Sequence, residues 1–332
     1  MPTPDLGAAA ALLRNATEVT LLAHVNPDAD ALGSALALGL ALRRRGVDVC
    51  VSFGMPNDVP ESLRVLDVAG LVVPAAEVPA APALLIVLDT ASKSRLGQLA
   101  DRVNATAEAG GAVLVLDHHA SNTFYGTHHV VDEAAEATAV LVLRLFDELA
   151  WPLEPDVARC VYAGLVTDTS SFRRATPDTH RLAARLIEAG VDPTTIARDL
   201  MDTHPFAFLQ MLAGVLDRAV LEPDAAGGHG FVHTAVRLDD LIGVRLEEVE
   251  SVVDIVRTTA EAEVAAVLKE ISSGHWTGSL RAVGKVDVRA VAEQFGGGGH
   301  RLAAGFSADG ELEDVITKLR EALRDPVLLA SG

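Results

Sequence analysis

Histidine and aspartate residues stand at the ends of three short apolar runs and after one helical segment. They are His24, Asp28, Asp30, Asp89, Asp117, His118, His119 and Asp168. Oxygen-rich sites with one or two imidazoles suit Mn²⁺ or Mg²⁺, and the absence of cysteine from this set argues against structural zinc. Four carboxylates and two imidazoles exceed the needs of one ion but suit a pair of ions that shares a carboxylate. Such a pair lowers the pKa of a water between the ions and supports an in-line displacement at phosphorus.

Each of these residues also has an ordinary explanation. An aspartate at a strand end is commonly a turn or cap residue. Asp28 and Asp30 are well placed to cap a helix that begins near Gly33. His118 or His119 alone is explained as a hydrogen-bonded polar residue. Because these explanations would have to coincide in four separate segments, we favour a single metal centre.

The elements that must position these residues are predicted from the apolar runs. Near-continuous apolar stretches, typical of parallel strands buried on both faces, occur at 18–24, 47–53, 83–89 and 112–117. Helical patterns follow at about 33–45, 134–150, 155–167, 178–189 and 193–202. The predicted fold class is therefore α/β, a doubly wound parallel sheet with a helical tail. Ligands of such sheets bind at the carboxyl ends of the strands, so three strands are expected to deliver His or Asp to one edge, which Asp168 closes.

The pattern changes near residue 205 and predicts a second, smaller domain. Strands are expected at about 229–236, 262–271 and 277–283, and helices at about 247–257, 287–295 and 312–325. This is a mixed α/β arrangement. The predicted organisation is a metal-binding domain at 1–190, a helical linker at 191–205 and a substrate-binding domain at 206–332, with the active site in the cleft between the domains.

A glycine run in the second domain is a candidate anion site. The run comprises Gly296, Gly297, Gly298 and Gly299 and is followed by His300. Consecutive glycines let backbone N–H groups approach a phosphate. A flexible loop is the alternative, but His300 and Arg281 on the preceding strand favour a phosphate or nucleotide grip.

Composition bounds the possible partners. The 332 residues include 46 acidic and 27 basic side chains, a formal charge of −19, which argues against long nucleic acids because these are held by clustered cations. Cys50 and Cys160 form no metal or redox spacing, and no apolar run approaches the ~18 residues of a membrane span. The sequence predicts a cytoplasmic protein without a membrane partner.

The order and spacing of these motifs resemble those of a known family. His24-Val-Asn-Pro-Asp28-Ala-Asp30, the isolated Asp89, Asp117-His118-His119 and Asp168 resemble the four motifs of the DHH phosphoesterases. The glycine run with His300 is similar to the motif of their C-terminal substrate-binding domain. The compact two-domain chain resembles the bacterial nanoRNase and pAp phosphatase branch, and in particular actinobacterial members that also act on cyclic di-AMP and pApA.

The resemblance implies a role for each residue. His24, Asp28 and Asp89 would hold one Mn²⁺, and Asp30, Asp89, His118 and Asp168 the other, with Mg²⁺ or Co²⁺ as substitutes. Asp117 would orient His118, His119 would face the scissile phosphate, and Asn122 would assist by hydrogen bonding. The distal phosphate or terminal nucleotide would be held by Arg281, Gly297, Gly298, Gly299 and His300. A homodimer is also expected from the resemblance.

The expected activity is hydrolysis of very short RNA, including pApA, to nucleoside monophosphates, and conversion of pAp to AMP. Three alternatives stay open: a cyclic di-AMP phosphodiesterase, a non-catalytic nucleotide-binding module, and an inorganic pyrophosphatase or polyphosphatase. A degenerate binding module would be expected to lack at least one ligand. The glycine run argues for nucleotides over inorganic phosphate substrates.

Overall fold

The structure, a computed structural model, describes residues 5–329 apart from the side chains of residues 246 and 247. The chain divides into two compact units, Met1–Thr203 and His204–Gly332. The division falls inside the stretch 191–205 that the sequence analysis assigns to a linker. That stretch also contains helix α7 (Pro193–Leu200), which belongs to the first unit.

The first unit is built on a five-stranded parallel sheet, as predicted. Its strands are β1 (Glu18–Ala23), β2 (Asp48–Phe53), β3 (Leu84–Leu88), β4 (Ala112–Asp117) and β5 (His128–Val131). Their order in the sheet is β2-β1-β3-β4-β5. Only β5 was not predicted, because its four residues begin with two histidines and lack the apolar run of a central strand.

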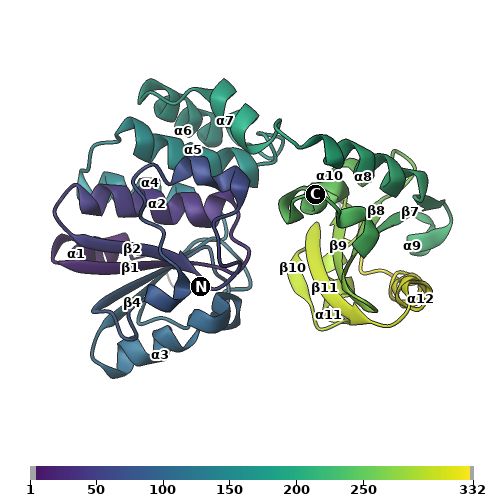
Figure 1. The fold of residues 1–332 in the computed structure, drawn as a ribbon, viewed down its shortest axis with the longest axis horizontal. Helices are drawn as coiled ribbons and strands as arrows, with labels where there is room; N and C mark the ends of the chain where they lie inside the picture. Colours follow the sequence, from purple (N-terminus) through teal and green to yellow (C-terminus); the bar gives the residue numbers. More distant parts are fainter. Residues whose placement is uncertain (1–4, 330–332) are drawn as a thin grey trace. The chain divides into compact units, whose positions relative to one another are not determined.

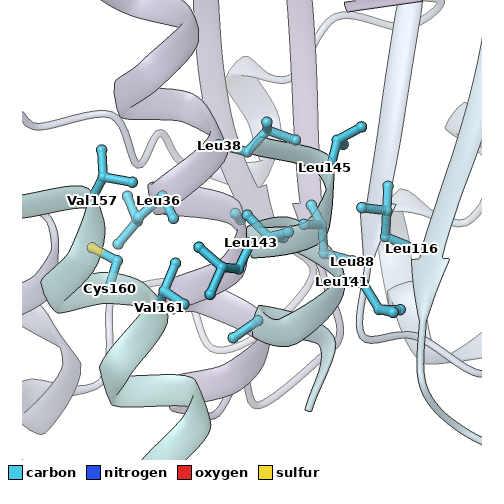
Figure 2. Close-up of a cluster of buried hydrophobic side chains, with 14 of the residues drawn as sticks. Leu36, Leu38, Leu88, Leu116, Leu141, Leu143, Leu145, Val157, Cys160 and Val161 are labelled. Carbon is cyan, nitrogen blue, oxygen red and sulfur yellow. The ribbon is translucent and has the colours of Figure 1, made fainter. Parts of the chain in front are cut away.

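Alternate residues of these strands pack on opposite faces, which explains why the runs are apolar throughout. On one face Ile86 and Leu88 join a core with helices α2 (Ala29–Arg43), α4 (Thr138–Leu149) and α5 (Pro155–Asp168). Figure 2 shows part of this core, where leucines of α2, β3, β4 and α4 meet Val157, Cys160 and Val161 of α5. On the other face Leu85 and Val87 pack with the segment around η3 (Lys93–Leu99) and helix α3 (Asp101–Glu108) (Figure 1).

Helix α2 begins earlier than predicted, at Ala29 instead of Gly33. The Asp28 carboxylate caps it by accepting the backbone N–H groups of Asp30 and Ala31 at 3.1 and 2.9 Å. All of its residues except Arg43 are buried because the helix lies between the sheet and α5. A Cβ on Gly33 would lie 2.6 Å from the carbonyl oxygen of Cys160, so glycine is needed for this close contact of α2 with α5. The contact places Asp30 beside α5, the helix that ends at Asp168.

Three further α-helices lie in the described part of the first unit, beside the short 3-10 helices η1 (Glu61–Leu66) and η2 (Ala75–Glu77). The three α-helices are α1 (Leu6–Arg14), α6 (Pro177–Glu188) and α7, of which only α1 was not predicted. Among the residues that the structure describes, no helix is long and apolar enough to cross a membrane.

The second unit is a mixed six-stranded sheet. Its strands are β6 (Val220–Glu222), β7 (Phe231–Val236), β8 (Val264–Ser272), β9 (His275–Ala282), β10 (Gly298–His300) and β11 (Ala303–Asp309). The order is β10-β11-β9-β8-β7-β6, in which β7 and β8 are parallel and the other pairs antiparallel. The predicted mixed α/β class is therefore confirmed, although β6, β10 and β11 were not predicted.

Helices cover both faces of this second sheet. Helices α8 (Phe206–Asp217) and α10 (Leu246–Val256) pack on one face, and α9 (Ala225–Gly228), α11 (Val288–Glu293) and α12 (Leu312–Ala322) on the other (Figure 1). Helix α8 was not predicted. It begins directly after Pro205, near the predicted change of pattern, because proline is tolerated just before a first helical turn.

Candidate metal centre

The strand order places the candidate ligands at one edge of the first sheet. His24 follows β1, Asp89 follows β3, and β4 ends at Asp117. Strands β1 and β3 are neighbours, while β2 lies on the far side of β1, so the direction of winding reverses between them. This is the topological switch point, where open α/β sheets bind their ligands.

A first group of donors forms around His24. Its Nε2 lies 3.6 Å from Asp28 Oδ2 and 3.5 Å from Asp89 Oδ2. Its Nδ1 donates to the carbonyl oxygen of Val25 at 2.8 Å, which leaves Nε2 as the nitrogen for a ligand. Asp89 has a positive φ of 53°, a conformation that is costly for a residue with a side chain and that recurs at functional sites.

A second group forms around His118 and shares Asp89 with the first. Nε2 of His118 lies 3.5 Å from Asp89 Oδ1 and 3.2 Å from Asp168 Oδ2. Ligand atoms of Asp30, Asp89 and His118 all lie within 4.8 Å of one another. The two oxygens of Asp89 thus face different groups, Oδ2 toward His24 and Oδ1 toward His118.

Burial and mutual repulsion shift the charges of this cluster. Burial raises the pKa of Asp30 well above its usual value, and repulsion from Asp168 and Asp89 raises it further. Burial and the charges of Asp28 and Asp89 raise the pKa of Asp168 to about 6, although a hydrogen bond with His118 opposes this. A carboxylate cluster of this kind needs added positive charge to stay ionised at neutral pH.

The pKa values of the two imidazoles are also raised, which in their case favours the charged form. Burial alone would lower the pKa of His24, but its contacts with Asp28 and Asp89 raise that pKa to about 10. The pKa of His118 is likewise raised to about 10, against the effect of burial, by Asp168, Asp89 and Asp30. Without another cation the histidines serve as the counter-charges of the carboxylates. This donor set, rich in oxygen with two imidazoles, therefore fits divalent cations such as Mn²⁺.

Thr138, which the sequence analysis missed, connects the two buried carboxylates. Its hydroxyl donates to Asp89 Oδ1 at 2.8 Å, and its backbone N–H donates to Asp30 Oδ2 at 2.7 Å. The N–H of Ala139 donates to Asp30 Oδ1 at 2.9 Å. The first turn of α4 thus stabilises Asp30 as helix N-termini stabilise anions. The sequence did contain a signal for this role, because Thr138 is a polar residue at the start of an apolar helical run.

The Asp-His-His motif is arranged differently from the expectation. Asp117 was expected to orient His118, but its Oδ1 accepts a hydrogen bond from His119 Nδ1 at 2.7 Å. His118 is instead held by the carbonyl oxygen of Ala135, at 3.2 Å from Nδ1. Asn122 Nδ2 donates to the other oxygen of Asp117 at 2.6 Å. The fully buried Asp117 therefore links Asn122 to His119.

The hydrogen bond to Asp117 determines which ring nitrogen of His119 can donate to a ligand. Burial lowers the pKa of His119, but the hydrogen bond to Asp117 and the charge of Asp89 raise it overall. Because Nδ1 is committed to Asp117, Nε2 is the nitrogen that can donate to a ligand.

The second-unit candidates lie on its outer strands. In the pairing of β9, β11 and β10, both Arg281 and His300 stand opposite Ala303, so they share one face of the sheet. Gly298 and Gly299 lie in β10, and the N–H of Gly297 donates to Ala292 O at 2.9 Å. The second half of the run therefore forms an edge strand, and Gly296 and Gly297 lie in the turn that leads to it from α11. A Cβ on Gly297 would lie 2.2 Å from the carbonyl oxygen of Gly305, which explains the glycine there.

Comparisons with known proteins agree with both units. The chain matches the N-terminal domain of the DHH family over residues 18–165 and the DHHA1 domain over residues 233–325. It is 30% identical over 315 residues to the bifunctional oligoribonuclease and PAP phosphatase NrnA of Thermus thermophilus, covering 94% of this chain and 91% of that protein.

Two solved structures share the fold. An exopolyphosphatase-related protein of Bacteroides fragilis superposes with a TM-score of 0.86 at 22% identity, covering 96% of this chain and 95% of that one. RecJ of Thermus thermophilus in complex with Mn²⁺ gives a TM-score of 0.56 at 17% identity, covering 98% of this chain and 56% of that one. The chain belongs to the DHH phosphoesterase family, and to those members that carry a C-terminal DHHA1 domain.

Proposed function

We propose that this protein is a two-metal phosphoesterase that hydrolyses very short oligoribonucleotides, including pApA, to nucleoside monophosphates and converts pAp to AMP. The observation that carries the proposal is the position of Asp89, whose two oxygens face two separate donor groups. A shared carboxylate is what a pair of ions requires. The substrate class is supported by the name of the Thermus relative, an oligoribonuclease and PAP phosphatase.

The proposed ligand sets follow the two groups. His24, Asp28 and Asp89 would hold one ion, and Asp30, Asp89, His118 and Asp168 the other. When bound, the ions supply an activated water and polarise the phosphoryl group. Mn²⁺ is the proposed metal, since the manganese complex of RecJ shares this fold, and Mg²⁺ or Co²⁺ would be substitutes.

The chain's own residues orient the phosphate and stabilise its charge. His119, whose Nδ1 is hydrogen-bonded to Asp117 and whose pKa is raised by that contact, would donate from Nε2 to a phosphate oxygen on which charge develops. Asn122 fixes the Asp117 carboxylate so that the donor does not have to reorganise during reaction. Its Nδ2 also lies 3.4 Å from the carbonyl oxygen of Thr90, directly after Asp89.

The second unit would grip the other end of the substrate. Arg281 and His300 lie on either side of the small Ala303 on one sheet face. They would provide two hydrogen-bond donors for a phosphate above that alanine. The edge strand formed by Gly298 and Gly299 offers backbone groups that are not paired with β11. The charge of −19 favours short substrates over long RNA.

A product time course with Mn²⁺ tests this proposal. We expect pAp and dinucleotides such as pApA to be hydrolysed faster than a long oligoribonucleotide, with AMP as the product. Asp89→Asn should lower turnover by at least about 10³-fold, since a metal clamp supplies several kcal/mol to the transition state. Asp101→Asn, a change of an exposed carboxylate on α3, is the matched control.

The same assay with cyclic di-AMP and pyrophosphate, and a binding measurement with AMP, would reveal three other functions. Faster hydrolysis of cyclic di-AMP than of pApA would make the cyclic dinucleotide the main substrate. Release of phosphate from pyrophosphate but not from pAp would favour an inorganic pyrophosphatase. Binding of AMP with Mn²⁺ but no hydrolysis of any substrate would indicate a non-catalytic module.

Thr138→Val tests how the shared carboxylate is positioned. The substitution keeps the shape of the side chain but removes the hydroxyl that donates to Asp89. Loss of a partner that orients a metal ligand typically weakens metal binding about 10–100-fold. We expect Mn²⁺ affinity to fall by that order in calorimetric titration while circular dichroism stays native. Unchanged affinity would show that Thr138 does not support the centre.

Metal binding should also depend on pH with a defined sign. Because the pKa values of His24 and His118 are raised to about 10, both imidazoles are protonated at neutral pH before an ion binds. Ligation requires their neutral form, so binding releases protons and strengthens as pH rises from about 6 to 8. Calorimetry in buffers of different ionisation enthalpy measures this release. Binding without proton release over that range would contradict the assignment.

A further inference from the structure

A guanidinium lies beside the candidate metal centre without a role in the assignments above. Arg95 belongs to η3, the segment that follows Asp89. Its Nη2 is 3.0 Å from Nδ1 of His24, whereas Nε2 of the same ring faces Asp28 and Asp89. The cation is therefore one imidazole away from the carboxylate cluster.

The backbone that carries this side chain is firmly docked. The carbonyl oxygen of Arg95 accepts the N–H of Val25 at 2.8 Å, which ties the segment to the end of β1. The next residue, Leu96, is fully buried. Gly97 has a φ of 57°, and a Cβ there would lie 2.7 Å from a methyl carbon of Val25. A Cβ on Gly54 would lie 2.3 Å from the carbonyl oxygen of Leu96, so the segment packs tightly on both sides.

Arg95 is an exposed residue and forms no ion pair with a carboxylate of residues 5–329. Some arginines of the first unit are paired with carboxylates, for example Arg185 with Asp147 and Arg159 with Asp199, whereas others, such as Arg43, are not paired within the described part of the chain. Arg95 is one of the latter, although the metal-site aspartates are close. Its donors are therefore available to an anion that enters the site.

The contact with His24 does not satisfy the Nη2 donor of Arg95, because Nδ1 of His24 is itself a donor to Val25 O. When Nε2 of His24 serves as a ligand, the ring proton is on Nδ1 and is donated to Val25 O, 2.8 Å away. Arginine has donors only, so it then has no acceptor at Nδ1. The Nη2 donor therefore lacks an acceptor on His24, and a phosphate bound at the centre would supply one.

Charge balance points the same way. The aspartates at 28, 30, 89 and 168 carry four negative charges when ionised, which two divalent ions neutralise. A phosphate that binds there needs further positive charge, and His119 is already hydrogen-bonded to the Asp117 carboxylate. Arg95 would provide this charge from the side of the cluster that contains His24.

We propose that Arg95 is a phosphate-binding residue of the first unit, whose guanidinium contacts the non-bridging oxygens of the phosphate under attack. The inference rests on the proposed function and adds a recognition residue to it. A guanidinium suits this role because its planar fork makes two parallel hydrogen bonds to phosphate.

Equilibrium binding of AMP to the full chain with Mn²⁺ tests the proposal. The 5′-phosphate of AMP is the group left at the centre after a dinucleotide is cleaved. For Arg95→Gln we expect the Kd for AMP to rise at least about tenfold, the effect of losing one charge-assisted hydrogen bond, while the Kd for Mn²⁺ alone changes less than about threefold. Arg95→Lys should recover part of the AMP affinity, because it restores the charge without the fork. Arg43→Gln, at the exposed far end of α2, is the matched control and should bind AMP like the native chain.

The outcomes separate this inference from the proposed function. Native AMP affinity in Arg95→Gln would overturn the inference and leave the proposed function intact. Parallel loss of AMP and Mn²⁺ binding would also overturn it, because Arg95 would then support His24 and not the phosphate. A native chain that binds Mn²⁺ but neither AMP nor inorganic phosphate would refute both.

Discussion

The main electrostatic constraint on the first unit is the concentration of negative charge around Asp89. Asp30 and Asp89 are almost completely buried, and Asp28 and Asp168 lie close to the same imidazoles. Carboxylates held this near one another repel strongly unless cations or hydrogen-bond donors compensate them. The fold supplies some compensation in the form of His24, His118, Thr138 and the first turn of α4. The remaining deficit is what makes the cluster a suitable site for divalent ions.

The architecture explains how such a cluster is held together. Parallel strands buried on both faces fix the positions where β1, β3 and β4 end, and the reversal of winding between β1 and β3 brings His24 and Asp89 side by side. Close packing of α2 on α5, permitted by Gly33, adds Asp30 and Asp168 from two helices. Polar residues at the site are thus positioned by apolar elements that cannot move independently. This rigidity lets the chain maintain the unfavourable proximity of the carboxylates.

Much of this arrangement could be predicted because it follows from local pattern. Apolar runs ending in His or Asp predicted both the parallel sheet and the edge where the candidate ligands meet. The partner of Asp117 could not be predicted, since adjacent His118 and His119 are equivalent in spacing and only the course of the chain after β4 distinguishes them. Thr138 was missed because it is more than a hundred residues from Asp30 in sequence and contacts it only in the fold. The glycine run was taken for a loop or an anion-binding nest because pairing with the small-residue strand β11 leaves no apolar periodicity.

The central claim is that Asp89 is shared by two metal ions. Anomalous diffraction at the manganese edge, from crystals of the full chain grown with Mn²⁺, measures this directly. We expect two manganese peaks in the first unit, one bonded to Nε2 of His24 and the other to Nε2 of His118. Both peaks should also contact the Asp89 carboxylate. A single peak, or two peaks neither of which contacts Asp89, would contradict the claim.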